Sequence, residues 1–96
     1  MSNRIAPKVA VVTGAAGGLG RAFVDRLLAD GLTVVGVDID GAALLAMAAD
    51  REGFVAEAAD LTDTEAIADL FDRLVARFGG VDALVNNAGT CFMSDF

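Results

Sequence analysis

The chain has 96 residues and a formal net charge of −7 at pH 7; 55% of its residues are hydrophobic and 22% are charged. This composition suits one small globular domain with a thin core and excludes a disordered chain. The acidic balance argues against a nucleic acid or an anionic membrane as partner, because both require a basic surface. No apolar run approaches the roughly 18 residues of a membrane span.

The first predicted elements are a strand, a glycine-rich turn and a helix. The run 9–12 is rich in valine, as expected of a strand buried on both faces of a parallel sheet. The turn over 13–20 reads Thr-Gly-Ala-Ala-Gly-Gly-Leu-Gly, and a helix over 18–30 follows, with Gly31 as its C-terminal stop. The apolar residues of this helix recur at helical spacing: Leu19, Ala22, Phe23, Leu27 and Leu28.

The glycine-rich turn is a candidate phosphate site. A strand that turns tightly into a helix leaves backbone N–H groups unpaired at the positive end of the helix dipole, where a pyrophosphate can accept them. Glycine suits this turn because a β-carbon would keep the phosphate away. A flexible Gly/Ala loop is the alternative interpretation of the turn alone. We expect Arg21, at the start of the helix, to be a solvated surface charge.

Two further strands each end at an aspartate. The run 32–37 predicts a second buried strand, which ends at Asp38. The run 53–59 is a weaker strand candidate because alanine has a low β preference, and it ends at Asp60.

Both aspartates could instead be helix N-caps. For that role, Asp40 is better placed than Asp38, because it directly precedes a short predicted helix over 42–49, and Thr62 is better placed than Asp60. We therefore prefer a binding role for Asp38 and Asp60.

The clearest helix in the sequence precedes a fourth strand. Thr62 and Glu65 form a capping box at its start, and Gly79-Gly80 ends it. Its apolar residues lie on one face: Ile67, Leu70, Phe71, Leu74, Val75 and Phe78. The fourth strand, over 81–85, runs into Asn86-Asn87-Ala88-Gly89, whose residue types suit a tight turn.

The alternation of strands and helices predicts an α/β fold with a doubly wound parallel sheet and helices on both faces. In such a sheet, ligands bind beyond the carboxyl ends of the strands. The glycine-rich turn, Asp38, Asp60 and the Asn-Asn-Ala-Gly segment each follow one of the four predicted strands. Asp38 stands eighteen residues after Gly20, close to the ~20 expected of an acidic residue that accepts hydrogen bonds from an adenosine ribose.

Taken together, Thr-Gly-x-x-x-Gly-x-Gly at 13–20 and Asn-Asn-Ala-Gly at 86–89 resemble the short-chain dehydrogenase/reductase family. The resemblance runs through nearly the whole chain. It implies a Rossmann-like sheet with strand order 3-2-1-4, incomplete relative to the full family fold. It also implies that residues 1–96 are the N-terminal NAD(P)-binding portion of a short-chain dehydrogenase, with the fourth strand as a bare edge.

The resemblance also implies which residues hold the cofactor. They are Gly14, Gly18, Leu19 and Gly20 on the pyrophosphate, Asp38 on the adenosine ribose, Asp60 and Leu61 beside the adenine, and Asn87, Ala88 and Gly89 in the cleft near the two riboses. Thr13 and Asn86 tie neighbouring turns together in the family, a role that is as much structural as binding.

The cofactor preference follows from charge. A carboxylate at Asp38 would accept bonds from the free 2′-hydroxyl of NAD but would repel the 2′-phosphate of NADP. NADP-preferring relatives often carry a basic residue at the positions that are Gly17 and Ile39 here. We therefore expect NAD, with NADP less favoured.

Family members act through a serine and a Tyr-x-x-x-Lys pair that follow the Asn-Asn-Ala-Gly strand, and this chain contains no tyrosine. The first hypothesis is an NAD-dependent oxidoreductase that exchanges a hydride with an alcohol or ketone, of which the chain is the cofactor half, without catalytic residues and inactive alone. The alternative is a truncated, non-catalytic dinucleotide-binding or assembly module. A homo-oligomer is possible if a catalytic half is present.

No metal site is expected, because the chain has no histidine. Its one cysteine, Cys91, allows no internal disulfide and has no histidine to activate it, so we interpret it as a small hydrophobic residue. The N-terminal arm lacks the apolar stretch of a signal peptide, and we expect a cytoplasmic protein.

Overall fold

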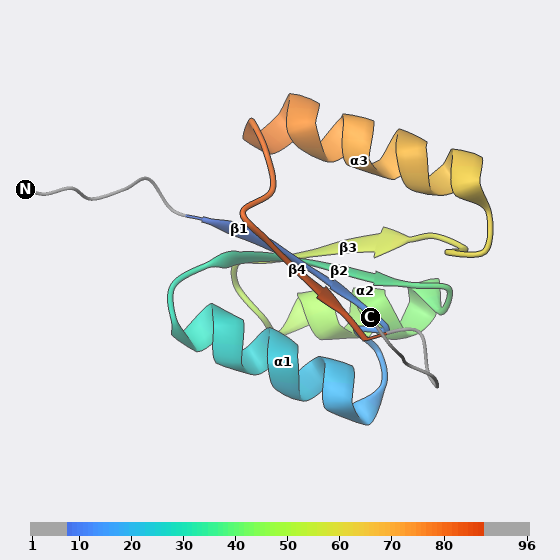
Figure 1. Cartoon of the computed structure of the whole chain (residues 1–96). Coiled ribbons are helices and arrows are strands. Elements are labelled where there is room, and N and C mark those ends of the chain that lie inside the picture. Colours follow the sequence, from blue (N-terminus) through green and yellow to red (C-terminus); the bar gives the residue numbers. More distant parts are fainter. Residues whose placement is uncertain (1–7, 88–96) are drawn as a thin grey trace, which may run out of the picture.

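The computed structural model describes residues 8–87, which form a four-stranded sheet with helices on both faces (Figure 1). The elements in chain order are β1 (Val9–Thr13), α1 (Gly18–Ala29), β2 (Thr33–Asp38), α2 (Gly41–Ala49), β3 (Phe54–Ala58), α3 (Thr64–Phe78) and β4 (Ala83–Asn86). The strand order is β3-β2-β1-β4, and all three strand pairs are parallel. The predicted doubly wound sheet with order 3-2-1-4 is therefore confirmed.

The core lies in two layers, one on each face of the sheet. In Figure 1, α1 and α2 cover one face and α3 covers the other. The buried residues of the first layer are Val12, Ala15, Val24, Val34, Leu44, Met47 and Phe54. Those of the second are Val9, Val11, Val35, Val37, Leu70 and Leu74. Successive residues of β1 and β2 alternate between the two layers, which explains why both strands are continuous apolar runs.

The helix starts show one confirmed cap and one correction. Asp40 caps α2 as predicted, since its carboxylate accepts a hydrogen bond from the N–H of Ala43 at 3.0 Å. The predicted capping box at Thr62 and Glu65 is wrong: α3 begins at Thr64, and Asp63 is its N-cap. Asp63 accepts the N–H groups of Glu65 and Ala66. The Thr62 hydroxyl is not at the cap because it donates to Asp60 instead.

The apolar stripe predicted for α1 is packed only in part: Leu27 and Leu28, near the end of the helix, pack against the core, and the residues nearer its start do not. Leu19 is 63% exposed and Phe23 is 36% exposed, whereas Gly20 and Val24 are buried. A β-carbon at Gly20 would lie 2.0 Å from the carbonyl oxygen of Gly14, so a glycine is what allows this side of α1 to approach the turn. The spacing of large apolar side chains therefore indicated the packed face only in the second half of α1, because Gly20 and Val24 form it nearer the start.

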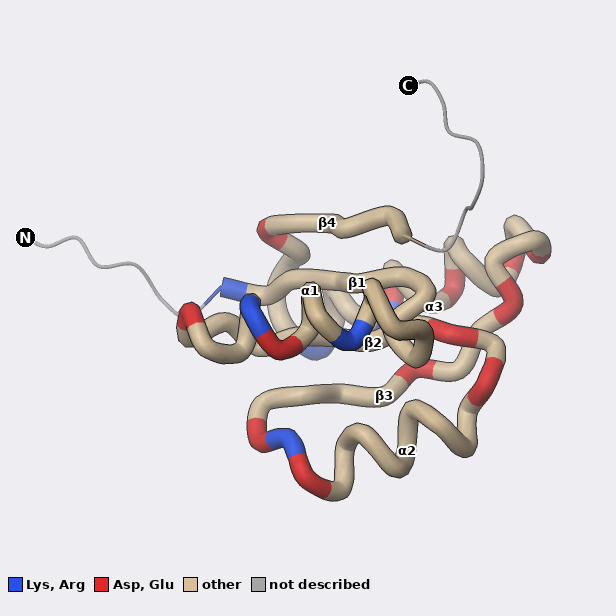
Figure 2. The backbone as a smooth tube through the Cα atoms, turned by 90° about the horizontal axis from the view of Figure 1, so that it is seen from below, with Lys and Arg blue, Asp and Glu red and all other residues tan. Residues whose placement is uncertain are grey.

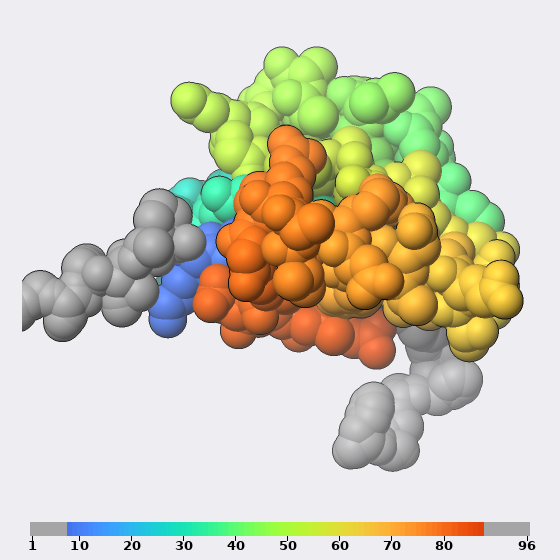
Figure 3. All heavy atoms as spheres, turned by 90° about the horizontal axis from the view of Figure 1, so that it is seen from above, coloured from blue at the N-terminus to red at the C-terminus, as the bar shows by residue number. Residues whose placement is uncertain are grey.

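The strand β4 starts two residues later than predicted and forms an exposed edge. It spans Ala83–Asn86 rather than 81–85, so Asn86 belongs to the strand and not to the turn after it. Leu84 is 55% exposed, and on the neighbouring α3 Val75 is 52% exposed. Figure 3 shows the side chains of β4 beside α3 at the molecular surface.

The charged residues lie outside α2. The tube of α2 in Figure 2 carries no Lys, Arg, Asp or Glu, and charged segments flank it on both sides. Leu44 and Met47 point into the core from this helix, and Leu45 remains 68% exposed on its outer side. No helix within residues 8–87 is long and apolar enough to cross a membrane.

Candidate functional site

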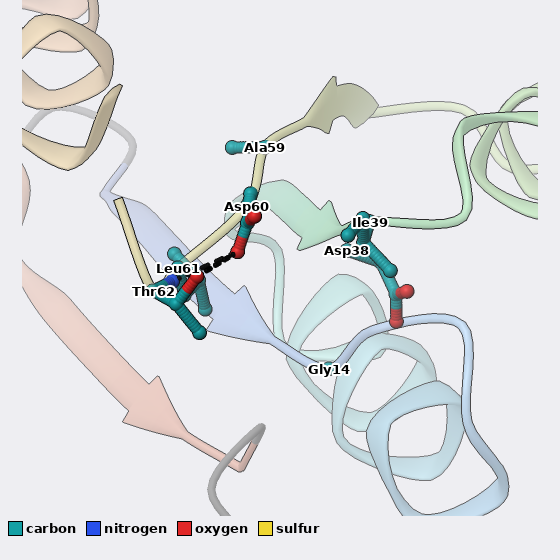
Figure 4. A pocket seen from close by; sticks show the side chains of 7 residues that line it. All are labelled: Gly14, Asp38, Ile39, Ala59, Asp60, Leu61 and Thr62. Carbon is teal, nitrogen blue, oxygen red and sulfur yellow. Dashed lines mark hydrogen bonds between the residues drawn. The ribbon is translucent and has the colours of Figure 1, made fainter. Parts of the chain in front are cut away.

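A cavity of about 320 Å³ lies at the carboxyl ends of the strands. Figure 4 shows around it the residues at the end of β2 and those that follow β3, with Gly14 at the start of the glycine-rich turn. The lining residues are Gly14, Asp38, Ile39, Ala59, Asp60, Leu61 and Thr62. The parallel arrangement brings these segments together, because the carboxyl ends of all the strands meet at one edge of the sheet.

The glycine-rich turn folds tightly between β1 and α1. Gly14 has a φ of 65°, a left-handed conformation that favours glycine, and its carbonyl oxygen accepts the N–H of Gly17 at 3.2 Å. The first intrahelical bond runs from the N–H of Arg21 to the carbonyl oxygen of Gly17. The N–H groups of the preceding helical residues therefore have no intrahelical acceptor, and no side chain within residues 8–87 caps them. This helix start can accept an anion.

Gly18 and Gly20 have different roles in the glycine-rich turn. For Gly18, apart from its chain neighbours and the backbone of its own helix, no atom of the described residues lies within 4 Å of where a β-carbon would stand. For Gly20, a β-carbon would lie 2.0 Å from the carbonyl oxygen of Gly14 and 2.9 Å from the α-carbon of Ala15. Gly20 is thus needed for packing inside the protein, whereas Gly18 leaves open space outside it.

Asp38 links the end of β2 to the glycine-rich turn. Its Oδ2 accepts the N–H of Ala16 at 3.1 Å, and its Oδ1 accepts the N–H of Asp40 at 3.0 Å. One residue earlier in the chain, the N–H of Ala15 donates to the carbonyl oxygen of Val37 at 3.2 Å. The bond from Ala16 to the side chain of Asp38 therefore extends the pairing between β1 and β2 by one more hydrogen bond. Each carboxylate oxygen has a further lone pair, which leaves capacity to accept hydroxyl groups from the cavity.

Asp60 lies on the opposite side of the cavity from Asp38 and accepts two hydrogen bonds from Thr62. The Thr62 hydroxyl donates to Oδ1 of Asp60 at 2.6 Å, and the Thr62 N–H donates to the same atom at 2.9 Å. These bonds lower the pKa of Asp60 below its ordinary value, with a small opposing effect of burial. Asp60 therefore carries a negative charge at neutral pH.

Thr13 ties the ends of β1 and β4 together. Its hydroxyl lies 3.1 Å from Oδ1 of Asn86, to which it can donate, and it accepts the N–H of Asn87 at 2.9 Å. The Asn87 side-chain amide donates to the carbonyl oxygen of Gly14 at 3.3 Å. The predicted tie between Thr13 and Asn86 is confirmed, and Asn87 extends it to the glycine-rich turn.

The structure brings four of the predicted site residues into the cavity lining: Gly14, Asp38, Asp60 and Leu61. Gly18, Leu19 and Gly20 form the first turn of α1, and Asn87 reaches the turn from the side of β4. Ala88, Gly89 and Cys91 lie outside the described residues.

Sequence reasoning missed Ala59 and Thr62 as lining residues and treated Ile39 only as a position that affects cofactor preference. Their position beside Asp38 or Asp60 at a strand end was the available signal. Arg21 is exposed as expected, but it is more than a solvated charge, because its Nε donates to the carbonyl oxygen of Ala16 at 2.9 Å. No cluster of three or more potential metal ligands occurs within residues 8–87.

This fold and cavity define a doubly wound α/β protein with a ligand crevice at the carboxyl ends of its strands. A family model described as short chain dehydrogenase matches residues 8–96, and the chain belongs to that family.

Individual relatives agree with this assignment. The chain is 44% identical over 87 residues to 1-deoxy-11-beta-hydroxypentalenate dehydrogenase of Streptomyces avermitilis, a match that covers 86% of this chain and 32% of the relative. It is 43% identical over 88 residues to human 15-hydroxyprostaglandin dehydrogenase, which is named for NAD(+); that match covers 85% of this chain and 33% of the relative. The chain thus spans about a third of the length of these curated relatives.

A solved structure shows the same fold. The 3-ketoacyl-(acyl-carrier-protein) reductase of Brucella melitensis, crystallised as a complex with NADH, superposes with a TM-score of 0.75 at 33% sequence identity. The superposition covers 80% of this chain and 32% of the reductase.

Proposed function

We propose that the chain is the NAD-binding portion of an oxidoreductase that transfers a hydride between the cofactor and an alcohol or ketone. The observation that carries this proposal is the cavity between Asp38, Asp60 and the glycine-rich turn, next to a helix start that can accept an anion. A volume of about 320 Å³ lies at the low end of the range of roughly 300–1,000 Å³ for small-molecule sites. It suits one end of a dinucleotide rather than the whole molecule.

The glycine-rich turn would hold the pyrophosphate. Gly14 supplies the tight turn, Gly18 leaves space for phosphate oxygens, and Gly20 lets α1 approach the turn closely. Leu19 stands in the first turn of α1, where its backbone N–H has no intrahelical acceptor and would be available to the same ligand.

The carboxylates would hold the adenosine. Asp38 would accept hydrogen bonds from the ribose hydroxyls while it keeps its bonds to the turn, and Asp60 and Leu61 would border the adenine. The negative charge of Asp38 would repel the 2′-phosphate of NADP, and no basic residue stands at Gly17 or Ile39 to offset it. This supports NAD as the preferred cofactor. Asn87, Ala88 and Gly89 would line the cleft near the riboses.

The nicotinamide would supply the hydride chemistry, and the chain's own residues would bind and orient it. The chain contains no tyrosine, the residue that gives or takes the substrate proton in this family, so we assign none of its residues a catalytic role. The second candidate is a dinucleotide-binding or assembly module without catalysis. The proposal also includes a cytoplasmic location, a small-molecule alcohol or ketone substrate for the full-length enzyme, and a homo-oligomer where a C-terminal catalytic half is present.

Calorimetric titration of the chain with NAD and with NADP tests the proposal. We expect NAD to bind and NADP to bind at least about tenfold more weakly, a difference of roughly 1.4 kcal/mol. Absence of binding to both would contradict the proposal. The intact mass of the protein isolated from its source then separates the two candidates: a mass well above 9.8 kDa favours the oxidoreductase, and a mass of 9.8 kDa favours the module.

A further inference from the structure

Gly36 in the middle of β2 has a neighbour that fills the space of its missing side chain. A β-carbon at Gly36 would lie 2.3 and 2.4 Å from two ring carbons of Phe54 and 3.0 Å from the β-carbon of Ala15. In the sheet, Phe54 pairs with Val34, two residues before Gly36, so the ring reaches diagonally across β2. The ring and the Ala15 methyl group therefore meet over a strand position that has no side chain.

Ala15 connects this contact to the glycine-rich turn. Its side chain is fully buried and belongs to the same core layer as Phe54. Its N–H donates to the carbonyl oxygen of Val37, and the next N–H, of Ala16, donates to Asp38. The turn is thus held from two directions, by hydrogen bonds to the end of β2 and by the packing of Ala15 over Gly36.

We propose that Phe54 is a positioning residue for phosphate binding. Gly36 is required because only a residue without a side chain leaves room for the Phe54 ring to pack against Ala15. This inference rests on the proposed function. Phe54 itself is 7% exposed and is absent from the cavity lining, so its influence on a ligand would pass through the position of the turn. Phosphates bound by backbone N–H groups are sensitive to such a displacement, because the donors cannot adjust independently of the turn.

The test compares two soluble probes that differ in their phosphates. Calorimetric titration measures the affinity of the full 96-residue chain for ADP and for adenosine, below the melting temperature of each variant as determined by circular dichroism. We expect Phe54→Leu to weaken ADP binding roughly tenfold, or about 1.4 kcal/mol, and adenosine binding less than about twofold, because the turn would contact the phosphates and not the nucleoside.

A matched control separates this effect from general loss of stability. Phe71→Leu makes the same truncation in the other core layer, on the α3 side of the sheet, where Phe71 is partly buried. We expect it to lower the melting temperature but to leave the ratio of ADP to adenosine affinity unchanged. The pair Gly36→Ala with Phe54→Leu places a methyl group where the ring was and should recover most of the lost ADP affinity.

The outcomes are distinguishable. If the unmodified chain binds ADP no more tightly than adenosine, the glycine-rich turn is not a phosphate site, and the proposed function fails together with this inference. If the unmodified chain prefers ADP and Phe54→Leu keeps that preference, or weakens both probes equally, only the role of Phe54 is refuted. If Phe54→Leu does not fold, Phe54→Met replaces it, because methionine conserves more of the side-chain volume. We expect this variant likewise to weaken ADP binding and to leave adenosine binding nearly unchanged.

Discussion

The paired strands β1 and β4 are both mainly apolar but have different surroundings. Val11 and Leu84 lie directly opposite each other in the sheet, yet Val11 is fully buried and Leu84 is 55% exposed. The difference arises because β1 has a neighbour on each side and helices over both faces, whereas β4 pairs only with β1 among the described residues. Apolar character therefore predicts that a segment is a strand, and the position in the sheet decides what its side chains contribute.

The two strands also carry different parts of the candidate site. The end of β1 continues into a turn held by hydrogen bonds to Val37 and Asp38 of β2. The end of β4 is held by Thr13 and by the amide of Asn87. At the opposite end, Asp82 accepts the N–H of Val9 at 2.8 Å, so polar side chains attach β4 to β1 at both ends. Polar ties compensate for the thin packing of the edge strand.

The largest expected effect is a loss of stability in the turn after β1, caused by the substitution Gly20→Val. Its β-carbon would meet the backbone of Gly14 and Ala15, which cannot move without opening the turn, so Gly20→Val should destabilise the fold by more than about 3 kcal/mol. Gly18→Val is the matched variant: it should leave the melting temperature nearly unchanged and abolish dinucleotide binding. Thermal unfolding and NAD titration measure the two effects. Retained NAD affinity in Gly18→Val would mean that the turn is not the site.

The second prediction compares the two strands directly. Val11→Ala should cost about 2 kcal/mol because it leaves a cavity between β1 and α3, whereas Leu84→Ala should cost less than about 1 kcal/mol because the side chain is already half in water. Urea unfolding of both variants at one pH measures the difference. Equal costs would show that β4 is covered in solution.

The third prediction changes the cofactor preference at the end of β2. Asp38→Ala with Ile39→Arg removes a repelling carboxylate and adds a guanidinium beside the position proposed for the ribose. We expect the ratio of NADP to NAD affinity to rise by roughly a hundredfold, or about 2.7 kcal/mol. Because Asp38 also holds the N–H of Ala16, the affinity for NAD should fall as well. An unchanged ratio, measured by calorimetry, would refute the assignment of Asp38.

The smallest predicted effect is the loss of stability in acid. Asp25 has a lowered pKa, chiefly because it accepts a hydrogen bond from Arg51, and the bonds from Thr62 lower that of Asp60. The unfolded chain takes up protons near the ordinary value of 3.8, and the folded chain only at lower pH. The stabilisation is therefore complete well above pH 3.8 and is lost as the pH falls through the lowered folded values.

Asp25→Asn isolates the contribution of the ion pair with Arg51. Since Asp25 is half exposed, we expect the pair to contribute no more than about 1 kcal/mol. Melting temperatures between pH 6 and pH 3 should fall less steeply in the variant than in the unmodified chain. An identical slope would contradict a native-state role for this pair.

The sequence alone determined the order of elements, the parallel sheet and the segments that line the cavity. Valine-rich runs, glycine stops and aspartates at strand ends are local signals, and parallel pairing follows from the alternation of strands and helices. The caps show the limit of such signals: Asp40 was predicted correctly, but Asp63 and not Thr62 caps α3. Thr62 is a suitable cap by residue type, and only the fold reveals that Asp60 already takes its hydroxyl.

Tertiary structure alone decided which residues at the start of α1 are buried and which role each glycine has. The sequence of the turn does not show that Gly20 is needed for packing and Gly18 is not. This difference depends on how closely α1 approaches the backbone of Gly14. The same holds for Gly36. A side chain at this position would collide with the ring of Phe54, which lies eighteen residues later in the chain. Close approach of this kind depends on residues distant in sequence, and a pattern of local spacing carries no information about it, although such a pattern did predict the buried Leu70 and Leu74 of α3.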